Sequence, residues 1–247
     1  MNLIIDSGNT SCKFAVYDGN RLIYSDMTKA DSTAAAAAVR KIRGEYHIIN
    51  SIFSSVSIEG ASVSEELRDI PGVAMELTPD TRIPIVNRYS TPKTLGNDRL
   101  AAAVGATVMF PGGNSLIIDV GTAITYDYVK DGCEYLGGNI SPGIDIRLRA
   151  LHDYTSRLPL IDDPQPTETF GLSTREAISN GVVMGVIHEI EGYVSDFEKK
   201  NVNSNIILTG GGSIYLSKKL KITIFAEPNL VNIGLNRILN YNVLKEN

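Results

Sequence analysis

The chain has 247 residues, of which 43% are hydrophobic and 21% are charged, and its net charge is −5. This balance is typical of a folded protein that can bury a core in each of two domains, and it argues against a disordered chain. Because the basic residues are scattered, we expect neither a nucleic acid nor a membrane as a partner. The N-terminus carries no basic segment and no apolar run is long enough to span a bilayer, so we expect a cytoplasmic protein.

The cysteines and histidines argue against a zinc site or a disulfide framework. Cys12 and Cys133 are far apart, and His47, His152 and His188 are isolated from them and from one another. Metal-binding and redox cysteines usually occur in close pairs. We therefore expect reduced thiols and histidines that serve packing or the surface.

The first half of the chain begins with three short apolar or alternating runs, at residues 3–6, 13–17 and 21–24, which predict a β-meander. Composition and turn residues then indicate, in order, a helix over 32–43, a strand over 48–54, a short helix over 62–69, a proline-containing surface loop over 78–95 and a helix over 98–110.

The second half repeats the same order of signals. Three runs resembling the first meander are followed by helices and one more strand, which the sequence predicts at 115–119, 125–129, 134–137, 144–154, 174–198 and 206–209. The turn-forming residues 111–114 separate the two copies. We therefore predict an α/β protein with an N-terminal lobe, 1–113, and a C-terminal lobe, 114–247.

Each copy of the repeat has an acidic strand end followed by a glycine-containing turn. The first is Asp6-Ser7-Gly8-Asn9-Thr10 and the second is Asp119-Val120-Gly121-Thr122-Ala123. Such turns expose backbone N–H groups and hydroxyls that can bind phosphate oxygens. One copy alone favours an ordinary hairpin turn, but two copies at equivalent places favour two phosphate-binding turns.

A third segment, Leu208-Thr209-Gly210-Gly211-Gly212-Ser213, runs from a strand into glycines that let a backbone pass close to a nucleoside. The order of two phosphate turns and then these glycines resembles the actin, sugar-kinase and Hsp70 superfamily. That resemblance implies two ribonuclease-H-like lobes, an actin-like ATPase fold, with the nucleotide in the cleft between them.

Within that superfamily the chain closely resembles the type III pantothenate kinases. The motifs that carry the resemblance cover nearly the whole chain: Asp6-x-Gly8-Asn9-Thr10, Gly96-Asn97-Asp98-Arg99, Asp119-x-Gly121-Thr122-Ala123-x-Thr125, Gly137-Gly138-Asn139-Ile140-Ser141-Pro142-Gly143 and Thr209-Gly210-Gly211. The resemblance implies an enzyme that transfers the γ-phosphoryl group of ATP to pantothenate and forms 4'-phosphopantothenate, the first step of coenzyme A biosynthesis. Asn97 stands where we expect Ala most often in the family.

The resemblance also implies the roles of individual residues. Asp98 is the expected catalytic proton acceptor. The expected ATP-binding residues are Asp6, Ser7, Gly8, Asn9, Thr10, Ser11, Cys12, Lys13 and Thr122. The expected pantothenate-binding residues are Tyr89, Gly96, Asn97, Asp98, Arg99 and Thr174. Asp119 is the expected ligand of a monovalent cation, K⁺ or NH₄⁺, Mg²⁺ is expected with ATP, and the family implies a homodimer.

Other interpretations of these residues remain open from the sequence. Asp98 or Thr174 can be a helix N-cap, Arg99 a solvated side chain and Tyr89 a loop aromatic that packs on its lobe. At the level of the whole protein, the alternatives are another small-molecule kinase of the same fold or a non-catalytic, nucleotide-binding accessory factor for transcription.

Overall fold

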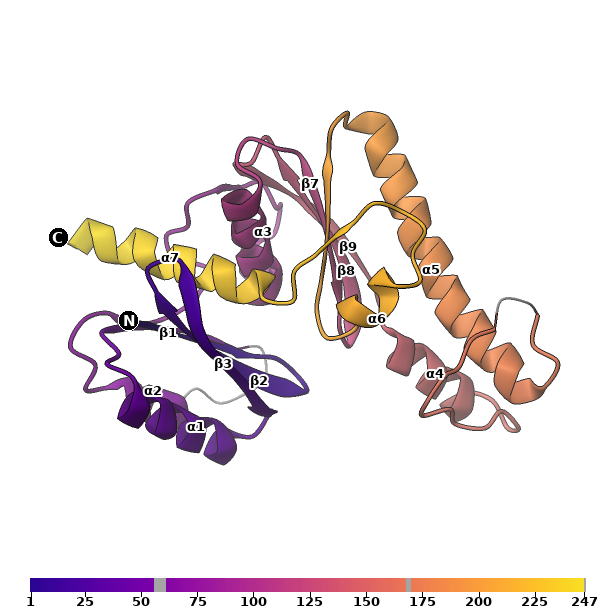
Figure 1. The fold of residues 1–247 in the computed structure, drawn as a ribbon, viewed down its shortest axis with the longest axis horizontal. Helices are drawn as coiled ribbons and strands as arrows, with labels where there is room; N and C mark the ends of the chain where they lie inside the picture. The colour runs from indigo at the N-terminus through magenta and orange to yellow at the C-terminus, as the bar shows by residue number, and fades with distance from the viewer. Residues whose placement is uncertain (56–60, 168–169, 247) are drawn as a thin grey trace. The chain divides into compact units, whose positions relative to one another are not determined.

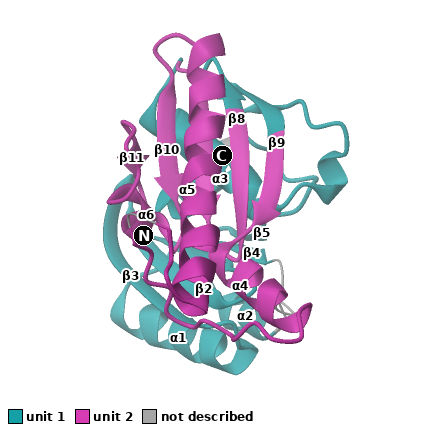
Figure 2. Ribbon diagram, turned by 90° about the vertical axis from the view of Figure 1, so that its right-hand side faces the viewer, with its two compact units in different colours: residues 1–112, 129–137, 229–247 teal, residues 113–128, 138–228 magenta. Residues whose placement is uncertain are grey.

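The structure, a computed structural model, describes residues 1–55, 61–167 and 170–246. The chain forms two compact units (Figure 2). The first unit is Met1–Gly112, Val129–Gly137 and Asn229–Asn247, and the second is Gly113–Tyr128 and Gly138–Pro228. These units differ from the predicted continuous lobes, because two later segments of the chain pack with the first unit.

The first unit is built on a five-stranded sheet with the strand order β3-β2-β1-β4-β5. The first three strands are antiparallel neighbours, whereas β4 is parallel to β1 and β5 is parallel to β4. The sheet strands are β1 (Asn2–Ser7), β2 (Ser11–Asp18), β3 (Arg21–Lys29), β4 (Asn50–Ser55) and β5 (Ala74–Glu76). The antiparallel β1, β2 and β3 confirm the predicted meander.

Helices cover both faces of this sheet (Figure 1). One face packs against α1 (Ser32–Glu45) and α2 (Ala61–Leu67), in a core that includes Leu3, Phe14 and Val39. Asp31 caps α1, since its side chain accepts a hydrogen bond from the N–H of Ala34 at 2.8 Å. Because side chains alternate along a strand, Leu3 and its neighbour Ile4 serve opposite faces.

The opposite face is covered by a helix that the sequence did not predict, α7 (Leu230–Glu246), which contacts β1 and β4. It packs closely on α3 (Asn97–Met109), where a Cβ added at Gly234 would lie 1.8 Å from the carbonyl oxygen of Ala101. On the sheet side of α7, Asn2 of β1 donates to Asn236 at 2.9 Å. A glycine is therefore required for the two helix backbones to approach.

The second sheet repeats the order of the first. Its strands follow the order β11-β10-β7-β8-β9-β6, so that its first five correspond to the first sheet read from the other end. They are β7 (Ser115–Val120), β8 (Ala123–Lys130), β9 (Glu134–Pro142), β10 (Asn205–Thr209), β11 (Phe225–Ala226) and β6 (Val86–Asn87). The internal repeat seen in the sequence is thus confirmed as a repeat of topology.

The core of the second unit lies between this sheet and the helix α5 (Thr174–Lys200), which runs along the sheet in Figure 2. Ile118, Tyr126, Val186 and Ile190 are among its fully buried or nearly buried members. Two shorter helices, α4 (Ile144–Asp153) and α6 (Ser213–Ser217), complete the unit.

The predicted loop 78–95 is partly wrong. It contains the strand β6, which is parallel to β9 with Val86 opposite Glu134, and a 3₁₀ turn, η1 (Pro92–Thr94). A two-residue strand has no periodicity to detect, so only the partner strand reveals it. The residues that flank these two short elements remain irregular.

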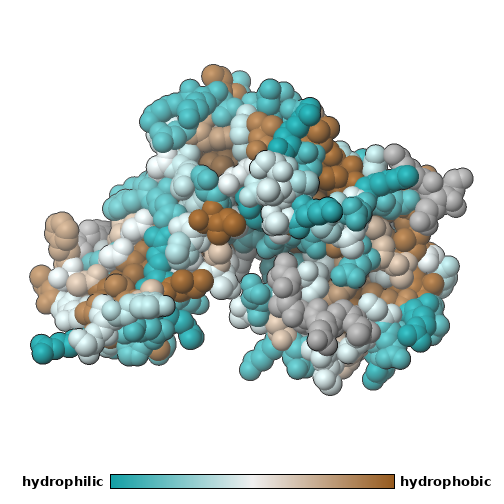
Figure 3. Space-filling model, turned by 180° about the vertical axis from the view of Figure 1, so that it is seen from behind, coloured by the Kyte–Doolittle hydropathy of each residue, from teal (hydrophilic) through white to brown (hydrophobic). Residues whose placement is uncertain are grey.

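On the face drawn in Figure 3, hydrophobic residues lie in small groups between hydrophilic ones. In the part of the chain that the structure describes, no helix is both long and apolar enough to cross a bilayer.

Candidate active site

The first glycine turn closes the β1–β2 hairpin. Asp6 and Ser7 end β1 in buried positions, and the N–H of Gly8 donates to the carbonyl oxygen of Ser11 at 2.9 Å. Asn9 and Thr10 are exposed at the tip. The sheet therefore holds the acidic strand end in place while the tip remains accessible to a ligand.

Four predicted ATP-binding residues come together across this hairpin. Asp6 lies opposite Lys13, and Ser7 lies opposite Cys12. Burial of the Cys12 thiol raises its pKa to about 12; the nearby Asp6 charge acts in the same direction, and a hydrogen bond with Ser7 opposes both. The thiol is therefore neutral near pH 7, so Cys12 presents no negative charge to a phosphate.

The predicted catalytic Asp98 lies in the first turn of α3 and is half-buried. The interpretation of Asp98 as the N-cap is wrong, because Gly96 holds that position, with φ −60° and ψ 134°. The Asp98 Oδ1 atom accepts from the N–H of Arg99 at 2.8 Å. The Asn97 side chain donates from Nδ2 to the carbonyl oxygen of Leu77 at 2.8 Å.

Gly96 is required beside Asp98 for a steric reason. A Cβ at Gly96 would lie 2.5 Å from Asp98 Oδ1, which is closer than ordinary contacts permit. The side chain of Asp98 therefore folds back over the start of its own helix, where the positive end of the helix dipole favours the carboxylate.

Arg99 is 6% exposed, so the interpretation of a solvated side chain is wrong. Its guanidinium lies over the ring of Tyr89, 5.7 Å from the ring centroid. The Tyr89 ring in turn lies 6.1 Å from that of Tyr135 and against Gly137, whose φ is +116°. The structure thus brings the predicted pantothenate residues Tyr89 and Arg99 together beside Asp98, although ten positions separate the two along the chain.

In the second unit, the second glycine turn joins β7 to β8. Asp119 is half-buried near the end of β7, and Gly121 and Thr122 are exposed. The N–H of Gly121 donates to the carbonyl oxygen of Ala123 at 3.0 Å. This turn is one residue tighter than the first, where the corresponding bond runs from Gly8 to Ser11.

Three glycines from other segments pack around the second turn. Gly210 has φ +87°, and a Cβ there would lie 2.3 Å from Asp119 Oδ1. The N–H of Gly212 donates to the carbonyl oxygen of Val120 at 3.0 Å, and that of Gly143 to the carbonyl oxygen of Thr122 at 3.0 Å. The predicted glycine segment after β10 therefore supports the Asp119 turn directly.

Thr209 is a residue whose side chain the sequence interpretation did not place in the site. It lies next to Asp119 in the β10–β7 pairing and is 1% exposed. Its hydroxyl and that of Thr125 have no hydrogen-bond partner among the described residues. A carboxylate beside a hydroxyl gives oxygen donors, which suit a hard cation, so these residues fit the cation expected at Asp119.

The described part of the chain contains no group of three or more His, Cys, Asp or Glu side chains that could hold a metal ion. A cation at Asp119 would therefore rely on hydroxyl, backbone carbonyl or solvent oxygens, in addition to this one carboxylate.

Thr174 is the first residue of α5 and is exposed. The N-cap interpretation of Thr174 is wrong, because Ser173 is the cap and accepts from the N–H of Glu176 at 3.3 Å. The Glu176 side chain accepts from the N–H of Leu172 at 2.7 Å, so a serine and a glutamate cap this helix between them. The Thr174 hydroxyl is therefore not needed for capping.

Solved structures of other proteins define the fold class of this chain. A Campylobacter jejuni chain described as a Baf family transcriptional activator matches with a TM-score of 0.63 at 21% identity, covering 97% of this chain and 98% of that one. The ROK hexokinase from Thermus thermophilus matches with a TM-score of 0.50 at 13% identity, covering 98% and 99%. Together with the repeated sheet order, they identify the α/β fold of the actin-like ATPases, with ribonuclease-H-like lobes.

Sequence similarity then narrows this class to one family. The family model for type III pantothenate kinase matches residues 2–196. The type III pantothenate kinase from Bacteroides fragilis (strain YCH46) is 41% identical over 242 residues, which cover 98% of each chain. The chain belongs to the type III pantothenate kinase family, as the resemblance predicted.

Proposed function

We propose that this protein is an ATP-dependent pantothenate kinase. It transfers the γ-phosphoryl group of ATP to the primary hydroxyl of pantothenate and forms 4'-phosphopantothenate, the first step of coenzyme A biosynthesis. The observation that carries the proposal is the meeting of Tyr89 and Arg99 beside Asp98, in a chain of this family. The Asp98 carboxylate, which is the proposed base, and the positively charged Arg99 guanidinium then belong to neighbouring residues. Pantothenate has both a hydroxyl and a carboxylate, so it requires such a pair.

On the acceptor side, Asp98 takes the hydroxyl proton as the oxygen attacks phosphorus. Arg99 supplies a positive charge for the acceptor carboxylate, and its contact with the Tyr89 ring limits the positions that the guanidinium can occupy. Gly96 and Asn97 line the start of the same helix. Thr174, exposed at the start of α5, is proposed as a further pantothenate contact.

On the nucleotide side, the turn from Asp6 to Lys13 contacts ATP together with Thr122. Lys13 adds a positive charge across the hairpin from Asp6. We assign a monovalent cation, K⁺ or NH₄⁺, to Asp119, beside the hydroxyl of Thr209. Mg²⁺ bound with ATP neutralises charge on the β- and γ-phosphates.

Family membership also supports a homodimer and a cytoplasmic location for the enzyme. Both are proposals that gel filtration with light scattering, and fractionation of the cells that produce the protein, can test directly.

The experiment that tests the proposed function is an ADP-release assay with pantothenate, Mg-ATP and K⁺. We expect ADP release only when pantothenate is present, and mass spectrometry should detect phosphopantothenate. Release of ADP with a sugar or another small alcohol, but not with pantothenate, contradicts the proposal and favours another kinase of this fold. Nucleotide binding with no turnover on any acceptor favours the accessory-factor alternative.

A further inference from the structure

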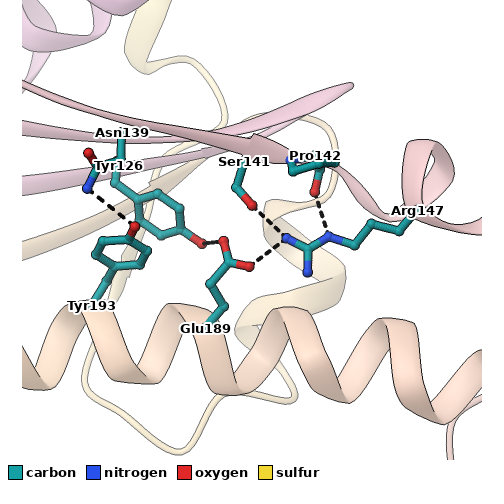
Figure 4. A network of polar contacts seen from close by, with 7 residues as sticks. All are labelled: Tyr126, Asn139, Ser141, Pro142, Arg147, Glu189 and Tyr193. Atoms are coloured by element: carbon teal, nitrogen blue, oxygen red, sulfur yellow. Dashed lines mark hydrogen bonds and ion pairs between the residues drawn. The ribbon is translucent and has the colours of Figure 1, made fainter. Parts of the chain in front are cut away.

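A polar network in the second unit joins two helices to the end of β9 (Figure 4). The Arg147 guanidinium, on α4, donates from Nη2 to Glu189 Oε2 at 2.6 Å and to Ser141 Oγ at 2.7 Å. Its Nε donates to the carbonyl oxygen of Pro142 at 2.7 Å. The other oxygen of Glu189 accepts from the Tyr126 hydroxyl at 2.8 Å. Both carboxylate oxygens are therefore engaged, and one guanidinium joins three segments.

The Glu189 carboxylate at the centre of this network stays negatively charged near neutral pH. Burial of Glu189 acts to raise the pKa of its carboxyl, but hydrogen bonds from Arg147, Ser141 and Tyr126 outweigh it, so the pKa lies below its usual value. The side chains of Arg147 and Glu189 are only 23% and 24% exposed. A partly buried guanidinium has lost some of its water contacts, so it is more stable when paired with a carboxylate in a fixed geometry than when unpaired.

Aromatic packing fixes the far side of the network. The rings of Tyr126 and Tyr193 stack with their centroids 4.0 Å apart, and Asn139 donates to the Tyr193 hydroxyl at 3.3 Å (Figure 4). Stacked rings restrict the rotation of both side chains. The Tyr126 hydroxyl therefore meets Glu189 in a defined position.

Arg147 is linked to the second glycine turn through one peptide group. The carbonyl oxygen of Pro142, which accepts from Arg147, and the N–H of Gly143, which donates to the carbonyl oxygen of Thr122 at 3.0 Å, belong to the same planar unit. A rotation of this plane moves both groups together. The peptide that the guanidinium binds is therefore the one that holds the Thr122 carbonyl.

The packing at Gly143 leaves this peptide little freedom. Gly143 is buried, and a Cβ there would lie 2.4 Å from the carbonyl oxygen of Gly121 and 2.5 Å from that of Thr122. These two carbonyls thus face Gly143. Carbonyl oxygens repel a phosphate, so a phosphate-binding turn works only when its carbonyls are directed away from the ligand.

We propose that Arg147 is a positioning residue for nucleotide binding: with Glu189 it fixes the Pro142–Gly143 peptide, which in turn holds the carbonyl of Thr122 in the second phosphate turn. This inference deepens the proposed function and rests on the assignment of Thr122 to ATP. It assigns Arg147 no contact with ATP itself. Its specific consequence is that loss of Arg147 weakens nucleotide binding and leaves pantothenate binding unchanged.

The test uses the full-length variants Arg147→Met and Arg147→Lys. Loss of one charge-assisted hydrogen bond corresponds to about a tenfold change in affinity. We therefore expect Arg147→Met to raise the KM for ATP about tenfold and to weaken the calorimetric Kd of a non-hydrolysable Mg-ATP analogue by the same factor, with the KM for pantothenate unchanged. Arg147→Lys keeps the charge beside Glu189 but lacks the planar fork that reaches both Glu189 and the Pro142 carbonyl, so it should also weaken nucleotide binding.

The matched control is Arg40→Met, which removes a 71% exposed arginine from its ion pair with Glu66 in the first unit. This control should bind the nucleotide analogue as the unchanged protein does. If Arg147→Lys binds the analogue with unchanged affinity, or if Arg147→Met weakens both substrates equally, the positioning role is wrong. Because the calorimetry contains no acceptor, weaker analogue binding by these variants supports the positioning role even if pantothenate is not the acceptor.

Discussion

The two glycine turns share a sequence pattern but are supported in different ways. The first, after Asp6, is closed within its own hairpin by the bond from Gly8 to Ser11. The second, after Asp119, is closed by the tighter bond from Gly121 and is held by glycines at positions 143, 210 and 212. The same motif is therefore a local structure in one unit and the product of several distant segments in the other. Substitutions far along the chain should disturb only the second turn.

The largest expected effect lies outside both turns, at Asp98. In Asp98→Asn, the side chain keeps its shape but cannot take the hydroxyl proton, so we expect kcat to fall about 10²- to 10⁴-fold. Calorimetric binding of a non-hydrolysable Mg-ATP analogue should be unchanged, since we propose that the nucleotide binds at the two turns and not at Asp98. Unchanged kcat rules out Asp98 as the base.

Matched removal of the two turn carboxylates separates their roles. Asp119→Asn should abolish the activation of turnover by K⁺ and raise the KM for ATP about tenfold, the equivalent of about 1.4 kcal/mol. Asp6→Asn removes the same charge from the first turn and should retain the response to K⁺. Turnover measured at increasing concentrations of K⁺ and of NH₄⁺ tests both variants. If Asp119→Asn still responds to K⁺, Asp119 is not the ligand of the monovalent cation.

A matched pair of glycine substitutions tests whether only the second turn depends on glycines from distant segments. Gly210→Ala introduces a Cβ at φ +87° and 2.3 Å from Asp119 Oδ1, so we expect a loss of about 1–3 kcal/mol of stability. In Gly8→Ala the nearest atom, the Ser11 carbonyl oxygen, would be 3.5 Å away, and the change should be within about 0.5 kcal/mol. Denaturant unfolding without nucleotide measures both. Equal losses would contradict the claim that the second turn depends on distant glycines.

The smallest expected effect concerns the Cys12 thiol behind the first turn. Its pKa is raised from 9.0 to about 12 in the folded protein, so its neutral form stabilises the fold fully below pH 9. This contribution is lost as the pH rises from about 9 towards 12, because the unfolded thiol ionises first. At pH 8, iodoacetamide should modify the exposed Cys133 and spare the buried Cys12, as peptide mass spectrometry can show. Rapid labelling of Cys12 in the folded protein would contradict its burial and raised pKa.

Much of the fold follows from patterns that are local in the sequence. The helix predicted over 32–43 is α1 (Ser32–Glu45), and the helix predicted over 98–110 is α3 (Asn97–Met109). Their composition and first residues are sufficient to predict them because the residues that favour, begin and end a helix are close neighbours in the sequence. The repeated Asp–Gly turns likewise indicated that the same succession of elements occurs twice along the chain.

The helix α7 was missed for a physical reason. Leu235, Asn236, Ile238 and Leu239 are all buried, so apolar and polar residues both face the interior and no clear stripe marks the helix. Its buried Asn236 is satisfied by distant groups, donating to the carbonyl oxygen of Gly19 and accepting from Asn2. Only the tertiary structure provides those partners.

The sequence by itself determined the α/β class, the order of the repeated elements and the residue types of the two phosphate turns, because each depends on neighbours along the chain. The tertiary structure alone decided that the Arg99 guanidinium lies over the Tyr89 ring and that Arg147 meets Glu189, 42 positions further on. Such contacts depend on how strands and helices pack, and the pattern around either residue contains no signal for its partner. The support of the second turn is therefore the feature that was least predictable from the sequence, since the segments that hold this turn are remote in the chain.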